Sequence, residues 1–154
     1  MDGLVLVAVG LPYWRAYPGR RRIWVLSLSQ GIAAATWALR CWPGWGFGGR
    51  QARGVIRDWA YSARHGRYPR LGGVDPRPGL AQVAIPVLAV SVEGDAFTPA
   101  STVDYIAAKL NAAPVVRRHY TAAEAGAPLD HFGWVRASAA LADRIAAFAT
   151  TPPS

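Results

Sequence analysis

The sequence has too few cysteines and histidines to hold a fold together by cross-links or metal ions. Its 154 residues include a single cysteine, Cys41, and three histidines. One cysteine cannot form an internal disulfide, and no group of cysteines and histidines has the spacing of a zinc site. We therefore expect no disulfide, no metal and no cofactor, and we interpret Cys41, next to Trp42, as a packing residue. With 52% hydrophobic residues, the chain instead has enough apolar material for the core of one globular domain.

Acidic residues are also scarce, and lysine is almost absent. Residues 11–80 contain twelve arginines but only two acidic residues, Asp58 and Asp75, a net charge of +10, whereas the rest of the chain has a net charge of −2. The same segment holds six of the seven tryptophans. Arginine interleaved with aromatic residues occurs on nucleic-acid-binding surfaces, but no nucleic-acid-binding motif accompanies it here. We predict no nucleic-acid partner.

No apolar run is long enough to be a clear membrane span. Ile23 to Leu39 carries no charge, but it is shorter than the roughly 20 apolar residues that a spanning helix needs. The segment favours a packed helix of a cap subdomain, and it leaves open a helix that touches a membrane surface or one that spans it. The first residues lack the positive region of a secretory signal, so we expect a cytoplasmic protein.

The apolar runs that are present are typical of buried strands. Three such runs cover residues 4–10, 85–92 and 115–120, and the third is more polar, as expected near a sheet edge. Helical patterns follow over residues 98–110, where Thr98 precedes a proline as a capping residue would, and over residues 133–148. This order predicts an α/β fold of about three parallel strands with flanking helices.

The remaining segments divide the chain into parts. Residues 11–80 contain no convincing strand and a second, basic helix over about residues 50–64. We interpret this segment as a helical insertion between the first and second strands, and residues 150–154 as a disordered tail.

The first strand poses a problem for a parallel sheet. It is apolar on both faces, yet nothing in the sequence precedes Leu4 that would supply a strand on its other side. We therefore expect the strand from Leu4 to Val9 to have an exposed edge that pairs with another polypeptide.

Two residues with catalytic chemistry follow consecutive strands. Asp95 comes just after the second strand, and His131 lies in the loop that follows the third. Ligand-binding and catalytic groups of open α/β sheets gather at the carboxyl ends of the strands. A carboxylate there would orient the imidazole and stabilise its charged form, leaving the other nitrogen as a general base. Asp130 is a rival acid, but its position next to His131 in the sequence makes the two side chains point apart.

These residues lie in segments that resemble a known family. "IPVLAVSVEGDAFTP" and "GAPLDHFGW" are similar to the acid and histidine segments of the α/β-hydrolase superfamily, in which the triad follows the chain order Ser, Asp, His. The segments "LPYWRAYPGRRR" and "GFGGRQARGVIRDWAYSARHGRYP" resemble bacterial predicted α/β hydrolases of a serine-aminopeptidase-like group. The resemblance implies that Asp95 is the triad acid and His131 the triad base. It also implies that residues 1–10 and 81–149 form a partial hydrolase core and residues 11–80 its cap.

One part of the family pattern is missing. No G-x-S-x-G nucleophile motif occurs in the sequence, so the resemblance covers only the carboxyl-terminal portion of a hydrolase. Ser91 lies within a strand and Ser101 at a helix start, and we expect no serine or cysteine of this chain to act as the nucleophile. We therefore predict part of a serine-type hydrolase of small ester or amide substrates that is inactive by itself. The alternatives are a non-catalytic binding or assembly module and a small basic membrane-associated protein.

Several apolar residues are expected on the same loop side as the pair. A substrate pocket there would be lined by five residues, which are Pro12, Tyr13, Trp14, Phe97 and Phe132. Its apolar character would suit an acyl chain or an aromatic group.

Overall fold

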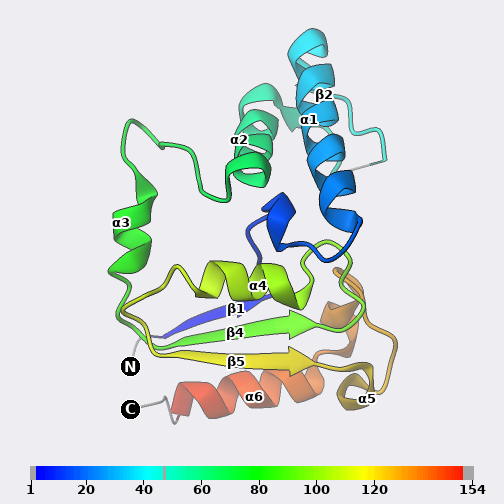
Figure 1. Ribbon diagram of the computed structural model, residues 1–154. Helices are drawn as coiled ribbons and strands as arrows, with labels where there is room; N and C mark the ends of the chain where they lie inside the picture. The colour runs from blue at the N-terminus through cyan, green and yellow to red at the C-terminus, as the bar shows by residue number, and fades with distance from the viewer. Residues whose placement is uncertain (1–2, 47, 151–154) are drawn as a thin grey trace. The chain divides into compact units, whose positions relative to one another are not determined.

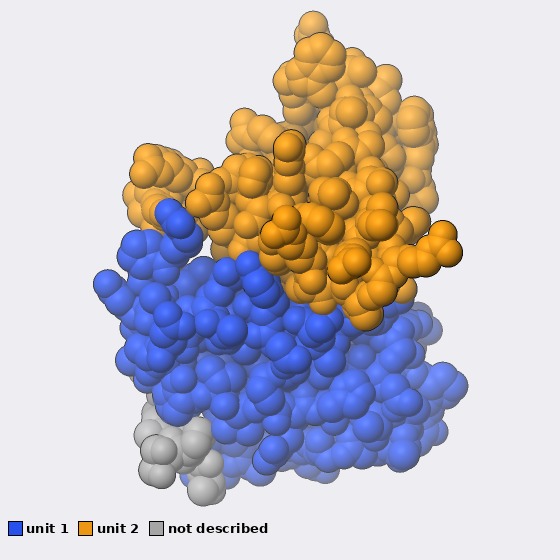
Figure 2. All heavy atoms as spheres, viewed as in Figure 1, with its two compact units in different colours: residues 1–10, 77–154 blue, residues 11–76 orange. Residues whose placement is uncertain are grey.

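A computed structural model describes residues 3–46 and 48–150 of the chain. It divides into two compact units, Met1–Gly10 with Arg77–Ser154, and Leu11–Pro76 (Figure 2). The boundary falls inside the short helix α3 (Pro76–Ala81). Residues 151–154, most of the predicted tail, lie outside the described residues.

The first unit is built on a three-stranded parallel sheet. Its strands are β1 (Leu4–Val7), β4 (Val87–Val92) and β5 (Val115–Tyr120), in the order β1-β4-β5, and both pairings are parallel. Every residue of β4 is buried, as its unbroken apolar run predicts for a central strand. The α/β fold with about three parallel strands and flanking helices is confirmed.

Two helices cover the sheet, one on each face (Figure 1). α4 (Ala100–Ala107) lies on one side, and α6 (Ala139–Thr150) lies on the other. Leu141 of α6 forms a buried cluster with Leu88 and Val90 of β4 and with Tyr120 of β5. Because successive side chains of a strand point to opposite faces, Val87, Ala89 and Ser91 of β4 face α4.

Several predicted element boundaries are wrong, each for a local reason. The helix over residues 133–148 is two elements, the 3-10 helix η2 (Gly133–Ala137) and α6, which also includes Thr150, assigned above to the tail. α4 begins at Ala100 after Pro99, and its predicted capping residue Thr98 makes no capping hydrogen bond because its hydroxyl contacts other groups.

The second unit consists of two packed helices with a small hairpin. α1 (Arg21–Leu39) packs against α2 (Arg53–His65), and a buried cluster joins Ile32 of α1, Ile56 of α2 and Trp42. The strands β2 (Cys41–Trp42) and β3 (Gln51–Ala52) pair antiparallel. The prediction of no strand in this segment is therefore wrong, because a two-residue strand is too short to show any alternation of apolar and polar residues. η1 (Trp14–Ala16) precedes α1.

α1 begins with two arginines and continues with the uncharged segment from Ile23 to Leu39, for which the sequence left a membrane span open. Its buried polar side chains are satisfied locally, with the Ser29 hydroxyl donating to the Leu26 carbonyl at 3.0 Å and Thr36 donating to the Ile32 carbonyl at 2.7 Å. Over the residues that the structure describes, no helix is both long enough and apolar enough to cross a membrane.

Candidate active site

The loop after β4 needs a glycine to bring two segments together. Gly94 has φ +72°, in the left-handed region, and a Cβ on it would lie 2.5 Å from the Leu129 carbonyl oxygen. A residue with a side chain would be strained there and would collide with that carbonyl. The close approach matters because Gly94 immediately precedes Asp95, and Leu129 lies two residues before His131.

Asp95 is held by four hydrogen-bond donors in a buried position. Its side chain is 0% exposed. Oδ1 accepts from the backbone N–H groups of Phe97 and Thr98, each at 2.8 Å, and Oδ2 accepts from the Thr98 hydroxyl and from Nδ1 of His131. A buried carboxylate is tolerated when its oxygens are satisfied in this way. The aspartate therefore has one fixed orientation, which points Oδ2 at the imidazole.

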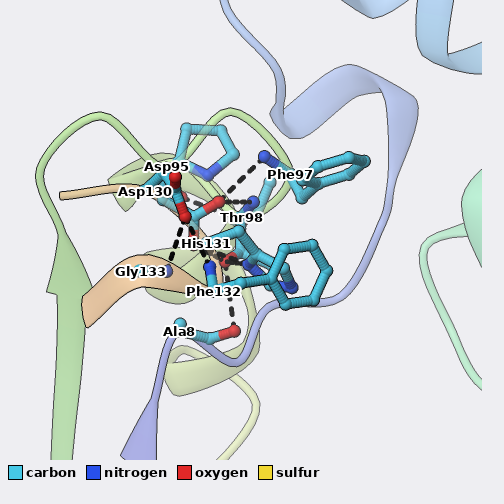
Figure 3. Close-up of polar contacts among 10 residues, drawn as sticks. Ala8, Asp95, Phe97, Thr98, Asp130, His131, Phe132 and Gly133 are labelled. Atoms are coloured by element: carbon cyan, nitrogen blue, oxygen red, sulfur yellow. Dashed lines mark hydrogen bonds and ion pairs between the residues drawn. The ribbon is translucent and has the colours of Figure 1, made fainter. Parts of the chain in front are cut away.

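His131 meets this carboxylate through one ring nitrogen (Figure 3). Nδ1 lies 2.8 Å from Asp95 Oδ2, and the histidine side chain is 25% exposed. Because a carboxylate accepts, Nδ1 carries the hydrogen of the neutral ring and the Nε2 lone pair is left available. Among the residues that the structure describes, Nε2 has no hydrogen-bond partner. The two residues predicted from separate loops are thus brought together.

Asp130, the rival acid, points elsewhere. Its Oδ1 accepts from the backbone N–H groups of Phe132 at 2.8 Å and Gly133 at 2.6 Å. These two hydrogen bonds, that of Gly133 foremost, lower the pKa of Asp130 below its ordinary value. Asp130 therefore fixes the turn after His131, and Asp95 orients the imidazole.

The loop that carries His131 is anchored at both ends. After β5, Thr121 and Glu124 form a reciprocal capping box at the start of α5 (Ala122–Ala125). The buried Tyr120 donates its hydroxyl hydrogen to the Ala137 carbonyl at the end of η2. The loop is thus tied down on either side of His131.

Thr98 is the member of the site that sequence reasoning missed. Its hydroxyl lies within hydrogen-bond distance of Asp95 Oδ2, 3.1 Å from the Ala8 carbonyl oxygen and 3.3 Å from Nδ1 of His131. Ala8 follows β1 and has φ +52°, a conformation that is uncommon for a residue with a side chain. Thr98 therefore ties the pair to the end of β1. A threonine three residues after the acid was a usable signal, but the proline beside it favoured the capping interpretation.

Of the five predicted pocket residues, two lie beside the imidazole. The ring centroid of Phe97 is 5.3 Å and that of Phe132 is 4.7 Å from the centroid of the His131 ring, and the rings of both phenylalanines are partly exposed. Pro12, Tyr13 and Trp14 belong to the second unit, so their place in a pocket stays a prediction.

No serine among the described residues hydrogen-bonds to His131. The buried Ser91 lies 2.9 Å from Nδ1 of His119, and Ser101 is part of α4. Within the described part of the chain, no three His, Cys, Asp or Glu side chains gather as they would around a metal ion.

Comparisons with known proteins add one distant similarity. No protein-family model matches the chain, and no curated protein matches it. The solved structure of an esterase from Rhodococcus sp. ECU1013 is similar, with a TM-score of 0.42 and 16% identity, over 98% of this chain. This chain spans 56% of the length of that esterase.

Proposed function

We propose that Asp95 and His131 are the acid and the general base of a serine-type hydrolase that acts on a small ester or amide. The observation that carries the proposal is the 2.8 Å hydrogen bond between Nδ1 of His131 and the buried Oδ2 of Asp95, which leaves Nε2 available. A general base of this kind needs an orienting carboxylate on one ring nitrogen and a second nitrogen that is available to a reacting hydroxyl, and these two features support the proposal.

In the proposed steps, every proton transfer passes through Nε2 of His131. Nε2 accepts the hydrogen of a serine hydroxyl as the serine oxygen attacks the substrate carbonyl, and the imidazolium then donates that hydrogen to the leaving alcohol or amine. A water molecule, deprotonated in the same way, releases the acid product and returns the serine. The Asp95 carboxylate stabilises the imidazolium in both halves and stays ionised.

The nucleophile in this proposal is supplied by residues other than these 154. A general base without an attacking serine and an oxyanion hole lacks both the bond-forming atom and the main electrostatic contribution to catalysis. We therefore propose that the 154-residue chain contributes the acid and base halves of a site and has no turnover by itself.

The test distinguishes the contribution of Asp95 and His131 from that of the nucleophile. The chain is assayed with a fluorophosphonate probe and a short-chain aryl ester, by itself and joined to the polypeptide encoded upstream in the same reading frame. We expect no labelling of the chain by itself, and hydrolysis by the joined protein that Asp95→Ala and His131→Ala each reduce at least about 10³-fold. Labelling of the chain by itself, or full activity without His131, contradicts the proposal.

A second candidate function is a binding or assembly module that uses the edge of β1. Within the described residues, β4 is the only hydrogen-bonded neighbour of β1. The N–H groups of Leu4 and Ala8 donate to Pro86 and Val90 carbonyls, at 2.9 and 3.0 Å. The alternation of a strand then turns the N–H groups of Val5 and Val7 to the open side.

We propose that a further strand pairs with this open side of β1. Stable association with a polypeptide that has no nucleophilic serine would favour this function over hydrolysis.

A further inference from the structure

The helix α1 has an inner face that its own unit covers. Its buried residues, Val25, Ser29, Ile32 and Thr36, recur every three or four positions and so form one stripe. Ile32 packs against Ile56 of α2 and against Trp42, and the Gln30 side chain donates to the Ala60 carbonyl of α2 at 3.0 Å. The orientation of α1 about its own axis is therefore fixed.

The opposite side, which we call the outer face of α1, is exposed and almost uncharged. Its exposed residues are Arg20, Ile23, Trp24, Ser27, Gly31, Ala34, Trp37 and Ala38. Trp24 is 54% and Trp37 69% exposed. At 3.6 residues per turn, these two tryptophans lie about 20 Å apart along the helix and about 140° apart around it. They therefore border the outer face on opposite sides near its two ends.

The net charge of the unit is strongly positive, and three of its arginines, Arg20, Arg21 and Arg22, lie at the start of α1. Leu11–Pro76 contains eleven arginines and only two acidic residues, Asp58 and Asp75, a net charge of +9. Asp58 is paired with Arg57 at 2.9 Å. Arg20 and Arg22 have no acidic partner among the described residues. Arg21 lies over the ring of Trp24, at 5.8 Å from its centroid.

A hollow beside Trp24 brings the aromatic and cationic groups together. It has a volume of about 300 Å³ and is lined by Arg20, Arg21 and Trp24. Guanidinium groups next to an exposed indole are suited to the boundary between charged headgroups and acyl chains.

We propose that the outer face of α1 docks on an anionic lipid bilayer, with the helix lying in the plane of the membrane surface. Negative headgroups attract the arginines at the start of α1, while Ile23, Trp24 and Trp37 enter the interfacial region. The uncharged stretch between them costs little to bring against lipid. A nucleic acid fits this face less well, because its phosphates would meet an uncharged surface from Ile23 to Leu39.

Vesicle binding by the whole 154-residue chain tests the proposal. Co-sedimentation is measured with vesicles of phosphatidylcholine, and of phosphatidylcholine mixed with phosphatidylglycerol. We expect binding to the mixed vesicles only, a loss of binding as salt shortens the electrostatic range, and a blue shift of tryptophan fluorescence on binding. No binding to the mixed vesicles, or equal binding to both kinds, overturns the proposal.

Matched variants locate the surface. We expect Arg20→Gln and Arg22→Gln each to weaken binding about fivefold, and the pair Trp24→Ala with Trp37→Ala to abolish it. The controls are Arg118→Gln on β5 and Trp45→Ala, which removes an indole that is 66% exposed but lies outside α1. Binding that falls as much in the controls as in the α1 variants overturns the proposal.

Two other occupants of the face are also distinguished. If the chain forms a dimer that Trp24→Ala disrupts, and does not bind vesicles, the outer face is a contact between copies. If a duplex DNA oligonucleotide competes with the mixed vesicles, and binds the double variant Trp24→Ala, Trp37→Ala with unchanged affinity, the arginines bind a nucleic acid. Either result overturns the lipid proposal.

Discussion

At the scale of single residues, the Asp95 and His131 pair owes its geometry to a third side chain. Thr98 contributes a backbone N–H to Oδ1 of Asp95 and a hydroxyl to Oδ2, and the same hydroxyl lies 3.1 Å from the Ala8 carbonyl. A hydroxyl has one hydrogen, so it donates to one of these two acceptors at a time. Thr98 is therefore a positioning residue, which holds the carboxylate against the end of β1.

Thr98→Val tests this role, because valine keeps the shape of threonine but not its hydroxyl. We expect a loss of about 1–3 kcal/mol in the free energy of unfolding, since the one hydroxyl hydrogen that the buried carboxylate oxygen and the Ala8 carbonyl share is removed. Thr98→Ser retains the hydroxyl and is the matched control. Urea denaturation of the two variants measures the difference. Equal stability of Thr98→Val and the unmodified chain would show that the Thr98 hydroxyl does not hold the Asp95 carboxylate in place.

Asp130 gives the turn after His131 a defined dependence on pH. Its pKa is lowered below the ordinary value of an aspartate, first by the backbone N–H of Gly133 and then by that of Phe132. A group with a lowered pKa in the folded state stabilises the fold above its unfolded pKa, and this contribution is lost as the pH falls through the folded value. We expect the unfolding free energy to decline on acidification below about pH 4.

Asp130→Asn isolates that contribution, because the amide oxygen still accepts from both N–H groups but does not titrate there. We expect the variant to show a smaller decline between about pH 5 and pH 3, measured by urea denaturation at each pH. Glu124, whose pKa is also lowered, first by the backbone N–H of Thr121, keeps titrating in both proteins. An unchanged pH profile would show that the turn after His131 does not depend on the Asp130 charge.

At the scale of elements, the loops are as important to the site as the strands that carry them. The approach of Gly94 to the Leu129 carbonyl joins the loop after β4 to the loop before η2, and this contact brings Asp95 to His131. Consecutive strand ends predicted that the two residues could meet. The sequence does not show that this contact requires a glycine at position 94. The requirement depends on the Leu129 carbonyl, which lies 35 residues further along the chain.

Gly94→Ala tests whether the contact between the loop after β4 and the loop before η2 requires a glycine. The left-handed conformation costs an alanine about 1–2 kcal/mol, and its Cβ would in addition collide with the Leu129 carbonyl. Gly126→Ala is the control, because Gly126 has φ +67° but open space around a Cβ. We expect the hydrogen-bonded Nδ1–H resonance of His131, seen by NMR, to disappear in Gly94→Ala and to persist in Gly126→Ala. Its persistence in both would show that the loops meet without the glycine.

The elements also show which patterns predict structure. The unbroken apolar run of β4 marks a strand buried on both faces, and the mixed run of β5 marks an edge strand, so the sheet could be predicted from the sequence. The helix after His131 could not be placed correctly, because Ser138 separates η2 from α6 although the apolar spacing continues through it. The Ser138 hydroxyl donates to the Val135 carbonyl of η2.

At the scale of the whole molecule, the net charge is distributed unevenly between the two units. Leu11–Pro76 has a net charge of +9, so the remaining residues together have a net charge of −1. The proposed hydrolytic pair lies in the nearly neutral unit, and the proposed lipid-binding face lies in the basic one. The two proposals therefore depend on separate residues, and the variants that test one leave the residues of the other unchanged.

In the described part of the chain β1 has a strand partner on one side only, and its other edge predicts how the chain associates. A strand with unpaired N–H and carbonyl groups on one side is a template for another strand. We therefore expect the chain to self-associate with increasing concentration, as sedimentation velocity would measure. Val5→Pro removes an N–H on the open side and should reduce association while β1 keeps its pairing with β4.

Leu6→Pro is the matched control, because the alternation of β1 turns the Leu6 N–H towards β4. Loss of a ladder hydrogen bond should lower the free energy of unfolding by about 1–3 kcal/mol, with no specific effect on the open side. Val5→Pro instead keeps the hydrogen bonds between β1 and β4 but loses the packing of the Val5 side chain against the buried cluster, so the two variants are distinguished by their association. If both variants associate as strongly as the unmodified chain, the contact between copies does not use β1. The outer face of α1 is then the next surface to test, through Trp24→Ala.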